Sequence, residues 1–329
     1  MMWRSTGMRW RDGRAVLGWS VGGRGGRRES EPAVGRRLAF ACRGGRRCLG
    51  VWRAGRYTQC PRAAEVPARG TRAQCQECAR IDRSYSVAAD TSVDDPRPYG
   101  VYLAYFGPGL LKVGITAVER GSARLLEQGA VAFVWLGRGP LMAARRAEGV
   151  LGGVLGVPDR VPYARKRAVR GELPGVQERM RELRECHARV WELAEWPESL
   201  SRLPFEPVDH SVEFGIPELE SAVERAAGDG GGGVVVRELV EGGVVAGRLL
   251  AAAGPDLHLW SSWRAPGTGR QRTGVVVVDT RLMSGWGLVA VEAGDGAVGS
   301  GASGVEVSVP VVDEGWGAAA GGGVQGDLF

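Results

Sequence analysis

The central part of the chain reads Tyr99-Gly-Val-Tyr-Leu-Ala-Tyr-Phe106, then Gly107-Pro-Gly109, then Leu110-Leu-Lys-Val-Gly-Ile115. Two runs rich in aromatic and β-branched residues around a Gly-Pro-Gly turn are typical of a β-hairpin. A short helix should follow and end at Gly129, since glycine favours the left-handed conformation found after a helix. A third strand and a helix that begins at Pro140 come next. The sequence therefore predicts a small three-stranded α/β core over residues 97–172.

This core resembles the GIY-YIG nuclease superfamily, and the resemblance covers less than a fifth of the chain. That family has Gly-Ile-Tyr on one strand and Tyr-Ile-Gly on the next, and here Gly100-Val101-Tyr102 and Lys112-Val113-Gly114 stand at those places. Arg124 stands where the family has an arginine on a helix, with Arg120 as the competing choice. Glu148 on the next helix stands for the metal-binding glutamate. Lys112 departs from the pattern, because an ammonium can contact phosphate but cannot act as a phenol.

The resemblance implies hydrolysis of phosphodiester bonds in DNA. In the family's mechanism Tyr102 would activate water, Arg124 would stabilise the phosphate charge, and Glu148 would hold one Mg²⁺ or Mn²⁺ ion. Leucine and alanine side chains recur around Glu148 at helical spacing, so its carboxylate lies on or beside an apolar face, where an unpaired charge is costly. The alternative is that Glu148 pairs with Arg145 or borders solvent.

A cysteine cluster precedes the core, with five of the six cysteines between positions 42 and 78. Cys75-Gln-Glu-Cys78 has the two-residue spacing at which both thiolates reach one tetrahedral zinc ion. Residues 48–52 and 56–60 can pair as antiparallel strands around Ala54-Gly55, which places Cys48 opposite Cys60 on the same side of the hairpin. One structural zinc ion is therefore predicted to be bound by Cys48, Cys60, Cys75 and Cys78.

Other interpretations of the cysteines stay open. Cys75 and Cys78 could form a redox pair, although the arginine-rich, hairpin-like surroundings lack the βαβ context of such pairs. The cysteines could also be ordinary buried residues. Cys42 could replace Cys48 as a ligand or be a plain strand residue, and Cys186 on a distant helix is interpreted as a packing residue.

The charge is distributed unevenly along the 329 residues, whose net charge is +6. The first 80 residues hold 18 basic and 5 acidic side chains, whereas residues 171–329 hold 12 basic and 24 acidic ones. A basic front half is expected of a chain that meets a polyanion there, here nucleic acid and most simply DNA. Lysine occurs only at 112 and 166, and so strong an arginine bias can also follow from genome base composition. A zinc protein that binds no nucleic acid is the corresponding alternative.

Two basic runs lie next to the core. They are candidates for contacts to the phosphates of nucleic acid, although such runs are usually just solvated faces. The candidate residues are Arg145, Arg146, Arg165, Lys166 and Arg167.

The chain ends with Gln325-Gly-Asp327-Leu328-Phe329. This pentapeptide resembles the motif by which bacterial DNA enzymes bind the sliding clamp. The stretch before it is rich in glycine and is predicted to be flexible, which would let the motif reach a partner. The alternative is a terminus without a function.

The remaining segments give the predicted organisation of an α+β protein. Asp12-Gly13 lies between alternating apolar and polar residues and predicts a hairpin, and the Gly- and Arg-rich residues 21–37 are expected to form a loop. A helical connector and Val-rich strands follow the core. The predicted units are an N-terminal hairpin and zinc module (1–96), the core (97–172), a helical connector (173–227), a small antiparallel β domain (228–293) and a flexible tail (294–329).

No run of eighteen apolar residues occurs, and the N-terminus lacks the apolar segment of a secretory signal, so we expect a cytoplasmic, nucleoid-associated protein without a membrane partner. The function expected is that of a zinc-containing, DNA-associated protein, with metal-dependent nuclease activity in DNA repair or maintenance. The alternative is a non-catalytic nucleic-acid-binding or clamp-associated adaptor. The order of the cysteine module, Lys112–Thr116 and Glu127–Ala130 also resembles a bacterial family of unknown function.

Overall fold

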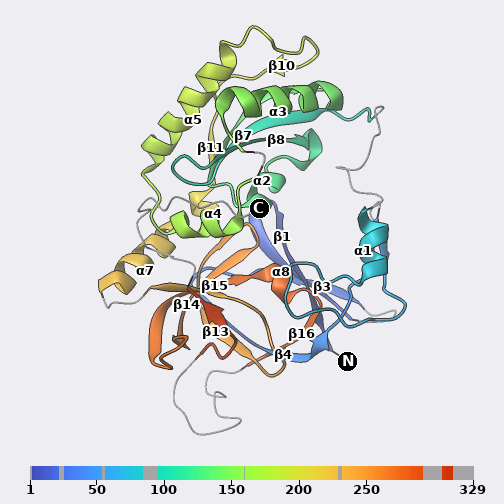
Figure 1. The fold of residues 1–329 in the computed structure, drawn as a ribbon, viewed down its shortest axis with the longest axis vertical. Coiled ribbons are helices and arrows are strands. Elements are labelled where there is room, and N and C mark those ends of the chain that lie inside the picture. The colour runs from blue at the N-terminus through green and yellow to red at the C-terminus, as the bar shows by residue number, and fades with distance from the viewer. Residues whose placement is uncertain are drawn as a thin grey trace.

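A computed structural model describes residues 2–21, 26–53, 56–83, 95–158, 160–228, 232–291 and 306–313. These residues form a large β-sheet, a smaller sheet covered by helices, and a two-stranded hairpin with its own helix (Figure 1). The smaller sheet and the large sheet lie one above the other, and α2 and α4 lie between them. Within the described ranges, no helix is both long and apolar enough to cross a membrane.

The large sheet takes its strands from both ends of the chain. In the described residues its order is β17-β12-β15-β14-β13-β4-β16-β1-β2-β3. The N-terminal strands are β1 (Arg4–Arg11), β2 (Arg14–Ser20), β3 (Arg27–Ser30) and β4 (Arg37–Arg46). The C-terminal strands are β12 (Gly233–Val236), β13 (Val244–Ala253), β14 (Asp256–Arg264), β15 (Gln271–Asp279), β16 (Trp286–Ala290) and β17 (Val311–Val312).

This sheet corrects the expected division into an N-terminal module and a separate C-terminal β domain. Strand β4 pairs with β13 on one side and with β16 on the other, so that Ala41 lies opposite both Val244 and Val289. Phe40 and Cys42 of β4 are buried in one core together with the valines of β15. Neither set of strands could bury its apolar face without the other, and the two ends therefore form one structural unit.

The predicted N-terminal hairpin is confirmed, but the expected loop after it is partly a strand. Arg11 pairs with Arg14, and Asp12 and Gly13 between them have φ values of 49° and 76°, the left-handed turn that an Asp-Gly pair favours. Strand β3 then pairs with β2 and forms one end of the sheet. Its charged and exposed side chains suit an edge strand, because charge there opposes pairing with another chain.

The smaller sheet contains the predicted hairpin and third strand. These are β7 (Tyr99–Tyr105), β8 (Leu111–Ala117) and β9 (Ala132–Gly139), in the order β9-β7-β8. Two short strands, β10 (Ser201–Arg202) and β11 (Val208–Asp209), also pair with β9. Part of the expected helical connector is therefore a component of this sheet.

Helices cover both faces of the smaller sheet. On one face α3 (Leu141–Leu155) and α5 (Val176–Trp191) bury their apolar sides in a common core. On the other face lie η1 (Val118–Arg120), α2 (Ala123–Gln128) and α4 (Tyr163–Arg170). As predicted, α2 ends at Gly129, whose φ is 71°. Three further helices pack against the large sheet, namely α6 (Ser211–Phe214), α7 (Ile216–Gly228) and α8 (Thr280–Met283), whereas α1 (Gln76–Arg83) packs on the two-stranded hairpin.

Part of the expected flexible tail is packed against the large sheet. Val307 bridges Val245 of β13 and Trp263 of β14, and β17 then pairs with β12 at one end of the sheet. Val307, Val309 and Val311 are buried there, because alternate residues of an extended segment point to the same side. The pentapeptide at 325–329 lies outside the described residues.

Candidate metal centre and candidate active site

The four-cysteine module is built from β5 (Val51–Arg53), β6 (Arg56–Thr58) and α1 (Gln76–Arg83). The predicted hairpin is present, but its register differs by one residue, since Trp52 pairs with Tyr57 and Cys48 does not face Cys60 within the ladder. Gly50 ends the ladder with a φ of 80°, and a Cβ at that position would stand 2.1 Å from the carbonyl oxygen of Thr58. The turn at Gly50 directs the chain so that Cys48 and Cys60 still meet beyond the strands.

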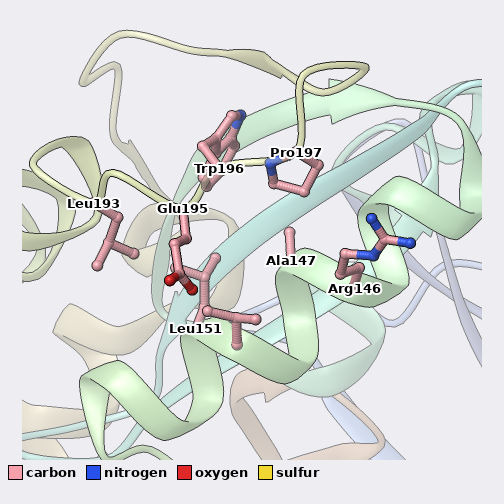
Figure 2. A pocket seen from close by; sticks show the side chains of 8 residues that line it. Arg146, Ala147, Leu151, Leu193, Glu195, Trp196 and Pro197 are labelled. Carbon is pink, nitrogen blue, oxygen red and sulfur yellow. The ribbon is translucent and has the colours of Figure 1, made fainter.

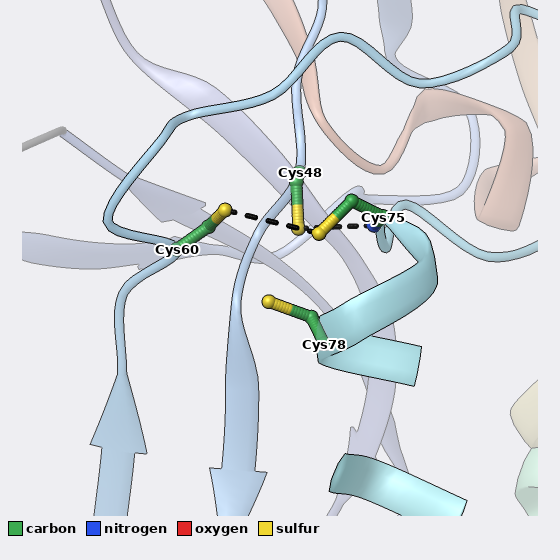
Figure 3. A group of neighbouring side chains, drawn as sticks. All are labelled: Cys48, Cys60, Cys75 and Cys78. Atoms are coloured by element: carbon green, nitrogen blue, oxygen red, sulfur yellow. Dashed lines mark hydrogen bonds between the residues drawn. The ribbon is translucent and has the colours of Figure 1, made fainter. Parts of the chain in front are cut away.

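The four predicted cysteines do come together (Figure 3). The Sγ atoms of Cys48, Cys60, Cys75 and Cys78 all lie within 4.8 Å of one another, and those of Cys60 and Cys75 are 4.0 Å apart. Sulfurs bound at about 2.3 Å to a tetrahedral zinc ion stand about 3.8 Å from each other. The donor set and its spacing therefore fit a metal ion such as zinc.

Backbone groups and burial act on these thiols in opposite directions. The N–H of Cys75 donates to the sulfur of Cys48 at 3.2 Å. Burial opposes ionisation of Cys60, but the backbone N–H groups of Ala64 and Arg62 and the thiols of Cys48 and Cys78 together outweigh it, and the pKa of Cys60 falls to about 7. Burial raises the pKa of Cys78. Four thiols this close do not all ionise easily, because neighbouring thiolates repel each other. A divalent cation between them would offset this repulsion and stabilise all four as thiolates.

The other two cysteines lie apart from this group. Cys42 is fully buried in β4, where burial raises its pKa to about 12. Cys186 is half-buried on α5, next to the core of the smaller sheet. Cys42 is thus a strand residue of the large sheet and does not take the place of Cys48.

Tyr102, the predicted catalytic tyrosine, lies on the face of the smaller sheet that α2 covers. Only 2% of its surface is exposed, and its ring packs edge-on against Trp135 with 6.1 Å between the ring centroids. The side-chain amide of Gln128 donates a hydrogen bond of 2.8 Å to its hydroxyl. Gln128 was not predicted from the sequence. The only feature that could have pointed to it is that it is a polar residue directly before Gly129, where the helix ends.

Arg124 and Glu148 are both near enough for their charges to influence the pKa of the Tyr102 hydroxyl. Burial is the main influence on the pKa of Tyr102 and raises it, while the bond from Gln128 and the charge of Arg124 lower it and the charge of Glu148 raises it. Arg124 is exposed on α2, and its guanidinium lies 3.9 Å from the carboxylate of Glu127. Glu148 is half-buried on α3. The charges of two residues predicted from separate segments therefore reach the Tyr102 hydroxyl, although α2 and α3 cover opposite faces of the sheet.

Lys112 and Arg120, the other two residues predicted for this site, have different surroundings. Lys112 is half-buried on β8, close enough for its charge to lower the pKa of Lys166. Arg120 pairs with Glu127 at 2.8 Å in an exposed contact. Because Arg124 acts on the Tyr102 hydroxyl, Arg124 fits the predicted helical arginine better than Arg120 does.

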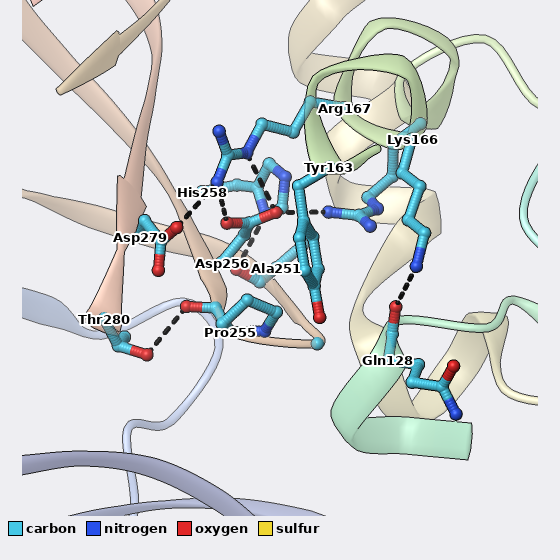
Figure 4. A network of polar contacts seen from close by, with 12 residues as sticks. Gln128, Tyr163, Lys166, Arg167, Ala251, Pro255, Asp256, His258, Asp279 and Thr280 are labelled. Carbon is cyan, nitrogen blue, oxygen red and sulfur yellow. Dashed lines mark hydrogen bonds and ion pairs between the residues drawn. The ribbon is translucent and has the colours of Figure 1, made fainter. Parts of the chain in front are cut away.

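The structure corrects the expected role of two residues in the second basic run. Lys166 is 4% exposed and Arg167 is also buried, so neither can reach nucleic acid in this fold. Arg167 forms ion pairs with Asp256 and Asp279, and Arg170 pairs with Asp256 at 3.0 Å (Figure 4). Helix α4 lies between the two sheets, and its cations therefore bind carboxylates of the large sheet.

The other predicted contacts lie at the surface. Arg146 and Arg165 are exposed, and Arg145 is half-buried. Arg146 borders a pocket of about 230 Å³ between α3 and the segment after α5, with Leu151, Leu193 and Trp196 among its lining and Glu195 on the opposite side (Figure 2). This pocket is mainly apolar and lacks the cluster of cations that a phosphate site needs.

Neither a curated protein nor a solved structure matches this chain. One family model, described as "Protein of unknown function (DUF2797)", matches residues 35–288. The match runs from the start of β4 into β16 and includes the four cysteines and the whole smaller sheet. The chain belongs to the DUF2797 family.

Proposed function

We propose that this protein is a zinc-stabilised, DNA-associated protein of the GIY-YIG type that cleaves phosphodiester bonds with the help of a divalent metal ion. The observation that supports the proposal is the arrangement of Tyr102, Arg124 and Glu148. They stand in the family's order on β7, α2 and α3. Gln128 of α2 donates a hydrogen bond to the Tyr102 hydroxyl, and the charges of Arg124 and Glu148 both influence the pKa of that hydroxyl. A site that only bound nucleic acid through basic residues would not need a carboxylate such as that of Glu148.

Each side chain has a role that its position supports. Arg124 is exposed and can stabilise the charge of a phosphate in the transition state. Lys112 on the neighbouring strand adds a second positive charge. Glu148 would hold the divalent ion, since one carboxylate is a usual protein contribution when substrate phosphate and water complete the coordination of Mg²⁺. Such an ion stabilises charge and lowers the pKa of bound water.

Tyr102 is better suited to positioning than to proton transfer. Its hydroxyl is buried and its pKa is raised, whereas a general base works best when its pKa is near the working pH. The hydroxyl contacts Gln128 and Arg124 and can hold the guanidinium in place. We therefore assign to Tyr102 the orientation of Arg124.

The test is cleavage of a panel of branched, flapped and single-stranded DNA with Mg²⁺ or Mn²⁺. Glu148→Gln should abolish cleavage and leave DNA binding unchanged, and Arg124→Ala should lower kcat. Glu178→Gln is the matched control, because Glu178 is an exposed acid on α5 that forms an ion pair with Arg181. Tyr102→Phe should lower kcat without moving the pH profile, as expected of a positioning residue. A panel that stays intact under all conditions would contradict the proposal.

A non-catalytic nucleic-acid-binding adaptor is the second candidate. It is favoured by two observations, namely that Tyr102 is buried and that a lysine stands at the second tyrosine position. An adaptor would bind members of the same DNA panel and cleave none of them, and Glu148→Gln would change nothing. The two candidates are thus separated by one set of measurements.

The proposed zinc ion would serve folding. Four cysteines form a closed ligand set without a position for substrate, which is typical of structural zinc sites. In such modules the free energy of metal binding contributes directly to the free energy of folding.

Binding to a sliding clamp through residues 325–329 stays a prediction. We expect a peptide that ends in this sequence to bind a bacterial sliding clamp with a dissociation constant on the order of micromolar. Replacing Leu328 and Phe329 by alanine should abolish the binding, because the motif's apolar pair would fill a pocket. Calorimetry that detects no binding at high peptide concentration would end this hypothesis.

A further inference from the structure

A groove of about 800 Å³ separates the four-cysteine module from the first strands of the large sheet. It does not include Tyr102, Arg124 or Glu148. Both of its walls carry arginines and aromatic residues. One wall, from β1 to β3, carries Arg9, Arg11, Trp19, Arg27 and Arg28. The opposite wall carries Trp52, Tyr57 and Arg72.

The charge of this groove is positive. Its lining includes five arginines but only two acids, Glu29 and Asp82. Glu29 is already paired with Arg11 at 2.8 Å. Among the described residues, no carboxylate forms an ion pair with the other four arginines of the lining. The groove is therefore complementary to a polyanion.

Aromatic rings on the module face the arginines of the edge strand. Trp52 and Tyr57 are cross-strand neighbours on β5 and β6, with ring centroids 6.2 Å apart. The guanidinium of Arg27 lies 4.4 Å from the centre of the Trp52 ring and 4.2 Å from that of Tyr57. Trp52 is 49% exposed even with this contact. These rings thus present flat surfaces to a planar group in the groove.

The next residue of the same strand repeats the arrangement. The guanidinium of Arg28 lies 4.4 Å from the ring of Trp3 and 5.6 Å from that of Trp19, its cross-strand neighbour on β2. Consecutive residues of a strand point to opposite faces, so Arg27 and Arg28 contact two separate aromatic pairs on the two sides of this edge strand. Arg28 and Trp19 still line the groove, whereas Trp3 does not. The groove therefore offers arginines next to aromatic rings, as phosphates stand next to bases in a nucleic-acid strand.

We propose that this groove binds single-stranded nucleic acid, with bases stacked on Trp52 and Tyr57 and phosphates held by the arginines. A base stacks on an aromatic ring more strongly than an exposed guanidinium does. A base can therefore displace Arg27, whose charge then becomes available to a phosphate. In a duplex the bases are already stacked on each other, so a duplex can use only the charge of the groove. The inference rests on the nucleic-acid association proposed above and is independent of cleavage.

The four cysteines support this groove. Trp52 and Tyr57 lie on the hairpin that Cys48 and Cys60 flank, and Gly50 and Val51 of the same segment line the groove. A metal ion on the cysteines would fix the position of the hairpin relative to the edge strand. Loss of the metal should thus weaken binding of a single strand even if the large sheet stays folded.

The test measures fluorescence anisotropy of labelled twelve-residue oligonucleotides without added Mg²⁺, so that cleavage cannot remove the probe. Oligo(dT), oligo(U) and a DNA duplex of the same length are the probes, and the first two separate DNA from RNA. We expect at least one single strand to bind about tenfold or more tightly than the duplex. Trp52→Ala/Tyr57→Ala should weaken that binding at least about tenfold, because stacking is lost. Arg28→Ala and Arg72→Ala should each reduce the slope of log K against log salt by about 0.7.

Trp191→Ala is the matched control, since Trp191 on α5 is also 49% exposed and lies outside the groove. It should keep the affinity of the wild type within about twofold, and the melting temperature and zinc content of every variant should match the wild type. Equal affinity for duplex and single strand would overturn the groove proposal but not the proposed function. Unchanged affinity of the Trp52→Ala/Tyr57→Ala variant for the single strand would have the same consequence. Displacement of the strand by polyglutamate as readily as by unlabelled oligonucleotide would also overturn it. Absence of binding to every probe would also overturn the groove proposal. The proposed function would be lost only if cleavage of the DNA panel were absent as well.

Discussion

The phenol of Tyr102 lies over Gly114, so closely that a Cβ at position 114 would stand 2.3 Å from the hydroxyl oxygen. The two residues are opposite each other in the pairing of β7 with β8. The backbone of Gly114 is not in the left-handed region, so its conformation does not require a glycine. The residue is a glycine because there is no room for a Cβ beneath the tyrosine ring. The Gly100-Val101-Tyr102 and Lys112-Val113-Gly114 motifs are thus connected by packing, because the tyrosine of one needs the glycine of the other.

Gly114→Ala should therefore destabilise the protein. The added methyl group must displace a buried ring that Gln128 and Trp135 hold in place, and such overpacking costs about 1–3 kcal/mol. Gly149→Ala on α3 is the control, since a Cβ there meets nothing within 4 Å and should improve helix stability by up to about 1 kcal/mol. Urea unfolding measures both. A Gly114→Ala protein as stable as the wild type would contradict the packing argument.

Metal analysis of the purified protein should find about one zinc ion per chain. Cys75→Ser should lose the metal and lower the melting temperature, because it removes one of four thiolates that the fold brings together. Cys186→Ser, which changes a half-buried cysteine on α5, should keep the metal. A protein that contains no zinc and melts at the same temperature with and without a chelator would refute the site.

Asp256→Ala should destabilise the contact between α4 and the large sheet. Asp256 is fully buried and accepts hydrogen bonds from both Arg167 and Arg170, so its removal leaves two buried cations without this partner. Breaking a buried ion pair in this way costs about 3–5 kcal/mol. Glu178→Ala, which removes the exposed pair with Arg181, should cost less than about 1 kcal/mol in the same urea experiment. Equal effects of the two changes would rule out a structural role of the network.

Lys166 should make the stability depend on pH. Burial, followed by the charges of Arg170 and Lys112, lowers the pKa of Lys166 from 10.5 to about 7. Between pH 7 and 10.5 the unfolded chain holds a proton that the folded chain has released, so the free energy of unfolding rises with pH by up to about 1.4 kcal/mol per unit. Below pH 7 both states are protonated, and the cost of the buried charge is complete.

Lys166→Met removes this cost, so its stability gain over the wild type should be largest below pH 7 and shrink toward pH 10. Urea unfolding at several pH values measures the difference. Arg165→Met, at the exposed neighbouring position, is the control and should show no such dependence. A difference between Lys166→Met and the wild type that stays constant with pH would show that Lys166 is protonated throughout.

Local patterns account for the features that were predicted well. The turn at Asp12-Gly13, the end of α2 at Gly129 and the strands around Gly107-Pro-Gly109 each depend on residues within a few positions of one another. Backbone sterics and turn chemistry act over that distance and can be recognised without a structure. The grouping of the four cysteines was also predicted, because ligand spacing limits how a metal site can form.

The candidate sites were predictable only in part. Sequence order placed Tyr102, Arg124 and Glu148 in one unit, but the burial of the tyrosine and its contact with Gln128 depend on how α2 packs on the sheet. The one-residue difference in the cysteine hairpin follows from Gly50, whose conformation a pairing argument does not include. Arg167 looked like a surface cation, yet α4 lies between two sheets and turns it toward Asp256.

The sequence by itself determined the local elements, the grouping of the four cysteines and the basic character of the front half. Only the tertiary structure decided that β4 joins strands some 200 residues later in the chain, and that the edge strand with Arg27 faces Trp52 and Tyr57 across a groove. The physical reason is that strand pairing is selected by burial of a shared core. Alternation along one strand shows which side is apolar, but it does not show which distant strand will cover it.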